Sequence, residues 1–481
     1  MRFQTSSESQ RAPSALHIPA EDLPRLPFRW SRLFTRLPGL LARLLRNQGR
    51  IGEVLLARFR ARIDAEVLAS PKDLDDVALA RRIASSDRIP WEELCRDGRV
   101  VLVALTGMAH CLLLAKLCVR WLGSGGPGLS NRLLVGLGGM EDAEAGLDLW
   151  RLAVLARQEP QAEAVVREED DAQAMRRRLE GVPAAAGFLQ AWDRFLEVHG
   201  HHGVGEFEMA NPRWADRPDL LIPMIRGHLA GLGRVDPVAQ AARLAAERRR
   251  LEADCLGRLG PVRRRIFASV LRRAQTGLRF RETMKSQAVR YFALVRSLSL
   301  DLGGRLRRRG VLAREEDIFI LEMGELEGAA TGTLDPRPLN DGRRQEHDRN
   351  AAYDPPAIVF GRFHPEESAP EVVDGRSGIL RGLGVSPGKA AGKARVILDP
   401  GKDQVLPGEV LVAPFTDPSW APCFLNAAAI VIDQGGLLSH GSIVAREYGI
   451  PCVVNVGPAT KVLRTGQEIE VDGDLGVVRL L

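Results

Sequence analysis

The hydrophobic pattern of the chain is helical from about residue 30 to residue 350. Leu40–Leu45 opens an amphipathic stretch, and Asp142–Arg157 carries leucines at spacings that suit a mostly buried helix. Val238–Leu259 and Val262–Leu312 are long, arginine-rich and periodic. The pattern predicts a large, mainly α-helical domain at residues 30–350, preceded by a flexible N-terminus at residues 1–29.

One apolar run, Val100–Ala115, stands out in this region. It is shorter than the ~20 residues that a membrane span needs, and it contains Thr106 and His110. We therefore expect a buried helix here, and no membrane segment.

The composition changes near Ala330, where Pro, Gly, Asp and Arg become frequent up to Asp374. This composition is typical of a connector with a few short strands. We place the linker between the domains at residues 351–378.

The last hundred or so residues alternate short β-type and helical runs, which predicts a small α/β domain at residues 379–481. The expected strands and the two helices between them are Ala394–Leu398, Val410–Val412, Ser419–Ala428, Ile430–Ile432, Ser442–Tyr448 and Cys452–Val454. The fold class is thus multidomain: a large helical domain followed by a small α/β domain.

Composition narrows the function classes. Hydrophobic residues make up 45% of the 481 residues, enough for large cores. The net charge is +6, but the arginines are scattered and aromatic residues reach only 5%, so no nucleic-acid partner is expected. Six cysteines without a CxxC pair, and a polar start without an apolar signal core, favour a reducing cytoplasm.

Candidate chemistry gathers around His440. An expected strand runs into Gly435 and Gly436, which permit a tight turn and close backbone approach. Ser439 is the expected N-cap of a helix that begins at His440 and ends at Gly449. A helix N-terminus favours an anion and disfavours the imidazolium, so His440 would be neutral and nucleophilic toward phosphorus. A single histidine near a helix start is more often a cap or a surface residue, but here the flanking glycines, serine and strands agree.

These residues carry a resemblance. The stretch Gly435–Pro451 resembles the signature of the mobile domain of PEP-utilising enzymes, a swivelling phosphohistidine domain. Further matching elements are Gly384–Gly388 with Gly392–Val396, Val410–Pro418 and Val471–Gly473, so that the resemblance covers about residues 379–481. It implies that His440 is the phosphorylated residue, and that Gly435, Gly436, Ser439 and Arg446 support it.

A glycine- and histidine-rich segment, His199–Trp214, interrupts the helical pattern. It admits three interpretations: a metal site of histidines and carboxylates, a polar loop, or a substrate loop. The segment resembles an element of rifampicin-phosphotransferase-like and PEP-synthase-like members of the family, which favours the third interpretation and no metal. The resemblance implies catalytic His201 and Glu206 and substrate-binding Glu208, Arg213 and His202, although His202 stands where the family usually has arginine.

A later helix carries Arg281 and Lys285, four residues apart and so on one face. Such a pair is either an ordinary solvated basic face or a clamp for a transferring phosphoryl group. The resemblance extends to this helix and assigns both residues to catalysis. The helical match is diffuse and spans about residues 30–350.

Full-length members of the family begin with an ATP-grasp nucleotide-binding module, and nothing in this sequence resembles one. We therefore expect a phosphotransferase component in which a separate ATP-grasp protein, with ATP and Mg²⁺, charges His440 for a small-molecule acceptor in the helical domain. Three alternatives stay open: a component of an ATP-dependent ligase, a non-catalytic binding or regulatory protein, and a fragment of a longer reading frame.

Overall fold

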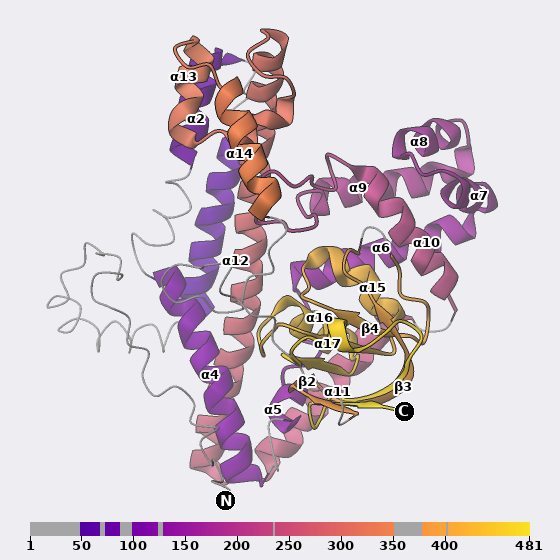
Figure 1. Ribbon diagram of the computed structural model, residues 1–481. Helices are drawn as coiled ribbons and strands as arrows, with labels where there is room; N and C mark the ends of the chain where they lie inside the picture. Colours follow the sequence, from indigo (N-terminus) through magenta and orange to yellow (C-terminus); the bar gives the residue numbers. More distant parts are fainter. Residues whose placement is uncertain are drawn as a thin grey trace, which may run out of the picture.

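A computed structural model describes residues 49–67, 73–86, 99–123, 128–233, 236–350, 378–400 and 403–481. Three predicted segments lie outside the described residues: the N-terminal segment 1–29, the amphipathic stretch at Leu40–Leu45 and the linker up to residue 377. The described chain forms a large helical region followed by a small mixed α/β domain, as the hydrophobic pattern predicts (Figure 1).

Helices account for almost all regular structure before residue 350. After an unlabelled helix at residues 49–67, they are α2 (Asp76–Ser86), α4 (Arg99–Leu122), α5 (Gly128–Arg132), α6 (Glu141–Gln158), α7 (Pro160–Glu168), α8 (Ala172–Glu180), α9 (Ala186–His199), α10 (Leu221–Gly231), α11 (Pro237–Gly257), α12 (Pro261–Arg308), α13 (Leu326–Thr331) and α14 (Arg337–Asn350). Short 3₁₀ turns η2 (Pro183–Ala185), η3 (Pro218–Leu220), η4 (Glu315–Ile320) and η5 (Met323–Glu325) join some of them.

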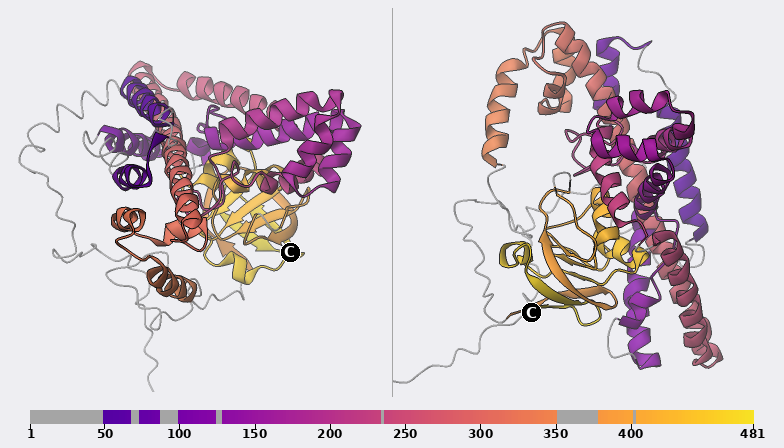
Figure 2. Two further views of the ribbon diagram at one scale, coloured as in Figure 1. Left: turned by 90° about the horizontal axis from the view of Figure 1, so that it is seen from above. Right: turned by 90° about the vertical axis from the view of Figure 1, so that its right-hand side faces the viewer.

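The helical region is organised on α12, a helix of 48 residues that would be about 72 Å long at ordinary helical rise. It begins with Pro261 at a position where no backbone N–H is needed, and it ends with Arg305, Arg307 and Arg308, whose charges suit a helix C-terminus. Helix α4 packs along its lower half, whereas α2, α13 and α14 gather at its upper end (Figure 1). A separate core of α6–α10 extends to one side (Figure 2).

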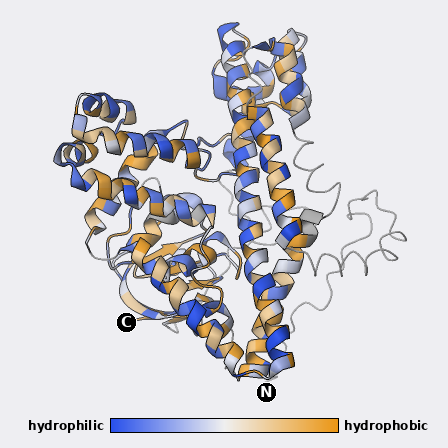
Figure 3. Cartoon of the chain, turned by 180° about the vertical axis from the view of Figure 1, so that it is seen from behind, coloured by the Kyte–Doolittle hydropathy of each residue, from blue (hydrophilic) through white to orange (hydrophobic). Residues whose placement is uncertain are grey.

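Helix α4 differs from the expectation of a buried helix. One face packs closely on α12, since a Cβ added at Gly107 would lie 2.6 Å from Gly277 Cα. The opposite face exposes apolar side chains, with Leu105 at 53% and Leu112 at 59% of full exposure, so apolar residues are visible along the outside of the long helices (Figure 3). The stretch Val103–Leu122 is long and apolar enough to cross a membrane, and 39% of it is buried.

The described part of the connector is also different from the prediction. Instead of short strands, Arg337–Asn350 forms helix α14, whereas α13 (Leu326–Thr331) lies mostly before the change near Ala330. Pro336 and Pro338 do not prevent this, because they lie just before and within the first turn of α14, where a missing N–H is tolerated.

The C-terminal domain contains an eight-stranded sheet in the order β1-β8-β7-β3-β4-β5-β6-β2. We call it the carrier domain, after the role that the resemblance implies for it. The central strands β3, β4, β5 and β6 are parallel, and the remaining pairs are antiparallel. The strands are β1 (Ile379–Arg381), β2 (Leu383–Ser386), β3 (Lys389–Val396), β4 (Val410–Ala413), β5 (Ala429–Ile432), β6 (Cys452–Val454), β7 (Glu468–Asp472) and β8 (Val477–Leu480); the helices are η8 (Pro418–Trp420), α15 (Ala421–Asn426), α16 (His440–Tyr448) and α17 (Ala459–Val462). The expected strands and helices of this domain are therefore present.

Strands β4 and β5 are buried along their whole length, as parallel strands covered on both faces are. Alternate residues of β4 and β5 pack into two different hydrophobic cores. Leu411, Ile430 and Ile432 face α15 and α16, whereas Val410, Val412 and Val431 face α17. The first core continues into the helical region through Leu137, Met140 and Leu147, so the carrier domain is docked on that region.

Candidate functional site

His440 is the first residue of α16, directly after the loop that follows β5. Its side chain is buried, with 8% exposure, and its ring stacks on Phe424 with 6.0 Å between the centroids. The structure thus places the imidazole at a helix N-terminus, as the sequence predicts, and fixes its plane against an aromatic ring of α15.

Ser439 occupies the N-cap position, but its hydroxyl does not cap the helix. It donates instead to the Gly436 carbonyl at 3.0 Å and pairs with the Ser442 hydroxyl at 2.9 Å. Ser442 also donates to Gly436 at 2.6 Å. The N-cap prediction is therefore right in position and wrong in chemistry: Ser439 ties the glycine loop to the first turn of α16.

Gly435 and Gly436 have different surroundings. A Cβ added at Gly435 would lie 3.1 Å from Ser439 Oγ and 3.2 Å from Val454 Cβ, a tight approach. A Cβ at Gly436 would meet nothing within 4 Å. Close backbone approach is thus a property of Gly435, and Gly436 contributes its carbonyl.

Gly441, next to His440, is the more demanding glycine. A Cβ there would collide with Ile432 Cδ1 and would lie 2.5 Å from Thr416 Oγ1. We expect Gly441→Ala to lower the free energy of unfolding by about 2 kcal/mol, as overpacking does. Gly436→Ala is the matched control and should change it by less than about 0.5 kcal/mol. Urea unfolding of both variants measures this, and equal effects would contradict the tight packing at Gly441.

Arg446 lies on the same helix and is almost fully buried, with 1% exposure. Its Nη2 donates to the Leu437 carbonyl, so the guanidinium holds the loop that precedes His440. Burial lowers the pKa of Arg446, and the nearby Glu447 and Glu282 oppose that shift. Glu282 belongs to α12, so the charge of the helical region acts on Arg446.

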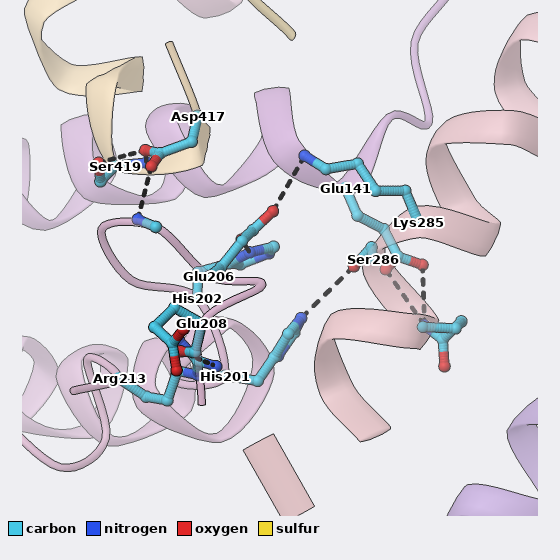
Figure 4. Close-up of polar contacts among 12 residues, drawn as sticks. Glu141, His201, His202, Glu206, Glu208, Arg213, Lys285, Ser286, Asp417 and Ser419 are labelled. Carbon is cyan, nitrogen blue, oxygen red and sulfur yellow. Dashed lines mark hydrogen bonds and ion pairs between the residues drawn. The ribbon is translucent and has the colours of Figure 1, made fainter. Parts of the chain in front are cut away.

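The segment His199–Trp214 is a loop that follows α9 and contacts α12 (Figure 4). Within it, His202 Nδ1 lies 2.8 Å from Glu206 Oε2. The other oxygen of Glu206 lies 3.0 Å from Lys285 Nζ on α12. Glu206 is 1% exposed, so the structure brings together three predicted site residues as a buried carboxylate between a cation and an imidazole.

His201 lies beside this group, with its Nε2 3.4 Å from Ser286 Oγ. Burial lowers the pKa of His201 well below its ordinary value, and the neighbouring His202 and His199 add to the shift. The ring is therefore neutral near neutral pH, and it binds a proton less readily than an ordinary histidine.

Arg281 lies on α12, four residues before Lys285. Its Nη1 bonds to the carboxylate of Glu282, the next residue. Lys285 thus contacts Glu206, and Arg281 contacts Glu282. The two-cation clamp for a phosphoryl group stays a prediction.

Glu208 and Arg213 hold the loop itself. Glu208 Oε1 accepts the Ala210 N–H at 2.9 Å, and its carbonyl accepts from Arg213 Nη2 at 3.1 Å. Arg213 is 2% exposed, and burial lowers its pKa. The substrate-binding roles of Glu208, Arg213 and His202 stay predictions.

Asp417 is the residue that the sequence analysis missed. It lies between β4 and η8 in the carrier domain, yet its Oδ2 accepts the N–H of Gly205 at 2.7 Å (Figure 4). Burial raises the pKa of Asp417, while the Ser419 and Gly205 donors oppose the shift. The only signal in the sequence is an acidic residue within Val410–Pro418, which does not indicate a contact with residue 205.

Further contacts join the carrier domain to the helical region. Glu447 accepts the N–H groups of Leu137 and Gly138, both at 2.9 Å, and the Tyr448 hydroxyl donates to the Ala143 carbonyl at 2.9 Å. Gln404 donates to the Pro223 carbonyl at 2.6 Å, and Asn426 to the Gly227 carbonyl at 3.4 Å. Burial raises the pKa of Glu447.

A cavity of about 760 Å³ also opens between the two parts of the chain. It is lined by Trp150, His228 and Gln240 of the helical region and by Tyr448 and Ile450 of the carrier domain. Because Tyr448 ends the helix that His440 begins, this cavity lies at the far end of α16, about 12 Å from His440 along the helix axis.

Within the described residues, no group of three or more His, Cys, Asp or Glu side chains is arranged to hold a metal ion.

Family models match both parts of the chain. Residues 405–476 match the mobile domain of PEP-utilising enzymes, and residues 99–282 match the fourth domain of rifampicin phosphotransferase. The C-terminal domain is thus similar to the mobile domain of PEP-utilising enzymes, as the sequence predicts.

Individual proteins are similar to most of this chain. The rifampicin phosphotransferase of Streptomyces sviceus is 33% identical over 391 residues, which are 78% of this chain and 44% of that protein. The prodigiosin synthesizing transferase PigC of Serratia marcescens is 31% identical over 377 residues, 76% of this chain and 42% of that protein. The chain thus spans less than half the length of these relatives.

Proposed function

We propose that this chain is the carrier and acceptor-binding component of a phosphotransferase. A separate ATP-grasp protein, with ATP and Mg²⁺ in the cytoplasm, transfers a phosphoryl group to His440. The carrier domain then docks on the helical region, where the P–N bond breaks and a P–O bond forms with a hydroxyl of a small-molecule acceptor.

The observation that carries this proposal is the docked position of the carrier domain. Thr416 packs beside Gly441, the neighbour of His440, and Asp417 bonds to Gly205, the neighbour of Glu206. Two short contacts thus relate the carrier histidine to the loop that holds Glu206, Lys285 and His201. A neutral His201 or the carboxylate of Glu206 would take the proton of the acceptor hydroxyl, and Lys285 would stabilise the transferred charge.

The relatives support the same chemistry, since several are named rifampicin phosphotransferase. Rifampicin is therefore the first acceptor to test. The relative named prodigiosin synthesizing transferase favours a second candidate, in which the phosphoryl group activates an acceptor for condensation with a further molecule.

The test uses ATP labelled at both the β- and γ-phosphates, the purified chain and a purified ATP-grasp protein. We expect label on the chain that is lost in acid and kept in base, as phosphoramidates are. The label should require the ATP-grasp protein and should leave the chain when an acceptor is added. A chain that takes no label with any nucleotide or partner, yet binds rifampicin, would instead be a non-catalytic binding protein.

A further inference from the structure

Asp417 uses its two carboxylate oxygens in different parts of the chain. Oδ1 accepts the Ser419 N–H at 3.0 Å and the Ser419 hydroxyl, both within the carrier domain. Oδ2 accepts the N–H of Gly205 at 2.7 Å, in the loop of the helical region. Ser419 thus orients the carboxylate, and the oriented carboxylate reaches the loop.

The loop is closely defined where it receives this contact. Gly205 has φ of 60°, in the left-handed region, and a Cβ there would lie 2.5 Å from Asn211 Nδ2. Asn211 in turn donates to the carbonyls of Val204 and Gly205 at 3.1 and 3.3 Å. The peptide that Asp417 holds leads directly into Glu206, whose carboxylate lies between His202 and Lys285.

The other side of the same segment touches the carrier helix. Thr416 Oγ1 lies against Gly441, one residue after His440. Thr416 therefore contacts the residue after His440, and Asp417 contacts the residue before Glu206.

We propose that Asp417 is a positioning residue, which aligns the Glu206 loop for transfer only when the carrier domain has docked. Its carboxylate restrains the Gly205 peptide in the docked state, and with it the Glu206 side chain that accepts or stabilises the acceptor proton. This deepens the proposed function and rests on it, but the loop contact itself is measurable without any substrate.

The decisive experiment is hydrogen exchange, followed by mass spectrometry, on the whole chain without ligand. In Asp417→Asn and Asp417→Ala, we expect backbone amides in peptides from residues 199–214 to exchange about tenfold faster than in the wild type, because a charge-assisted hydrogen bond is lost. Asn is the nearly isosteric variant, and it cannot accept from both Ser419 and Gly205 with its single oxygen.

Glu447→Gln is the matched control, since Glu447 also accepts backbone N–H groups of the helical region but contacts Leu137 and Gly138. It should speed exchange near residues 137–143 and leave residues 199–214 unchanged. Unchanged exchange at residues 199–214 in Asp417→Asn would overturn the proposal. Equally fast exchange there in Glu447→Gln would also overturn it, because both variants would then only loosen the docking of the carrier domain.

The kinetic readout separates this role from the proposed function. Asp417→Asn should take label on His440 at the wild-type rate, but should pass it to rifampicin with a kcat at least about tenfold lower and an unchanged KM. If the wild type also takes no label, the proposed function fails while the exchange result still decides whether Asp417 restrains the loop. Normal transfer by Asp417→Asn would overturn the positioning role.

Discussion

A His440→Ala variant is expected to carry no acid-labile phosphate after incubation with ATP, Mg²⁺ and the ATP-grasp protein, whereas the wild type becomes labelled. The effect should be complete, because no other histidine in the described residues combines a helix N-terminus with the glycine loop and the buried Arg446 support. Scintillation counting of the chain after separation in alkaline conditions measures it.

His347 provides a matched control, because its side chain is 83% exposed on α14. His347→Ala should label like the wild type, and so should His201→Ala, which is impaired only in the later transfer. Since His440 stacks on Phe424, His440→Gln is made in parallel, and thermal unfolding verifies that both variants are folded. Label on either His440 variant at the wild-type level would remove the carrier assignment.

The second large effect is expected for Lys285→Met, which should slow phosphoryl transfer from His440 to rifampicin by about 10²–10³-fold, the usual loss when a charge-stabilising donor is removed. Labelling of His440 should be unchanged, because the proposed function places Lys285 on the acceptor side. The rate at which label leaves the chain after rifampicin is added measures transfer.

Stability gives an independent check on this pair. Lys285→Met leaves Glu206 buried without its cation, which should cost about 3 kcal/mol in the free energy of unfolding. Adding Glu206→Gln should restore most of that loss but none of the transfer. A double variant that regains transfer would mean that the pair serves the fold alone.

The sequence predicts the carrier domain well because its signals are local. A strand, two glycines, a helix start and a left-handed Gly449 all lie within residues 429–449, and each depends on backbone preferences that neighbouring residues express. The helical region is predicted in class but less well in detail. The partly exposed face of α4 and the helix α14 were missed, because apolar length and proline content say little about what packs alongside.

The contacts of the candidate site are also hard to predict from the sequence. Helical spacing places Arg281 and Lys285 on one side of α12, but the contact of Lys285 with Glu206 depends on how a distant loop folds back. Asp417 and Gly205 are 212 residues apart, and no local pattern connects them. Roles that depend on contacts between distant segments are therefore those that a single sequence conceals.

The docking contacts described above have a consequence for how such proteins diversify. Five side chains of the carrier domain, Gln404, Asp417, Asn426, Glu447 and Tyr448, bond to main-chain atoms of the helical region. Main-chain groups survive most substitutions, so residues around an acceptor can change while the docking bonds are kept. Under the proposed function, one carrier domain is thereby compatible with helical regions of different specificity, and chimaeras that exchange these regions have a structural basis.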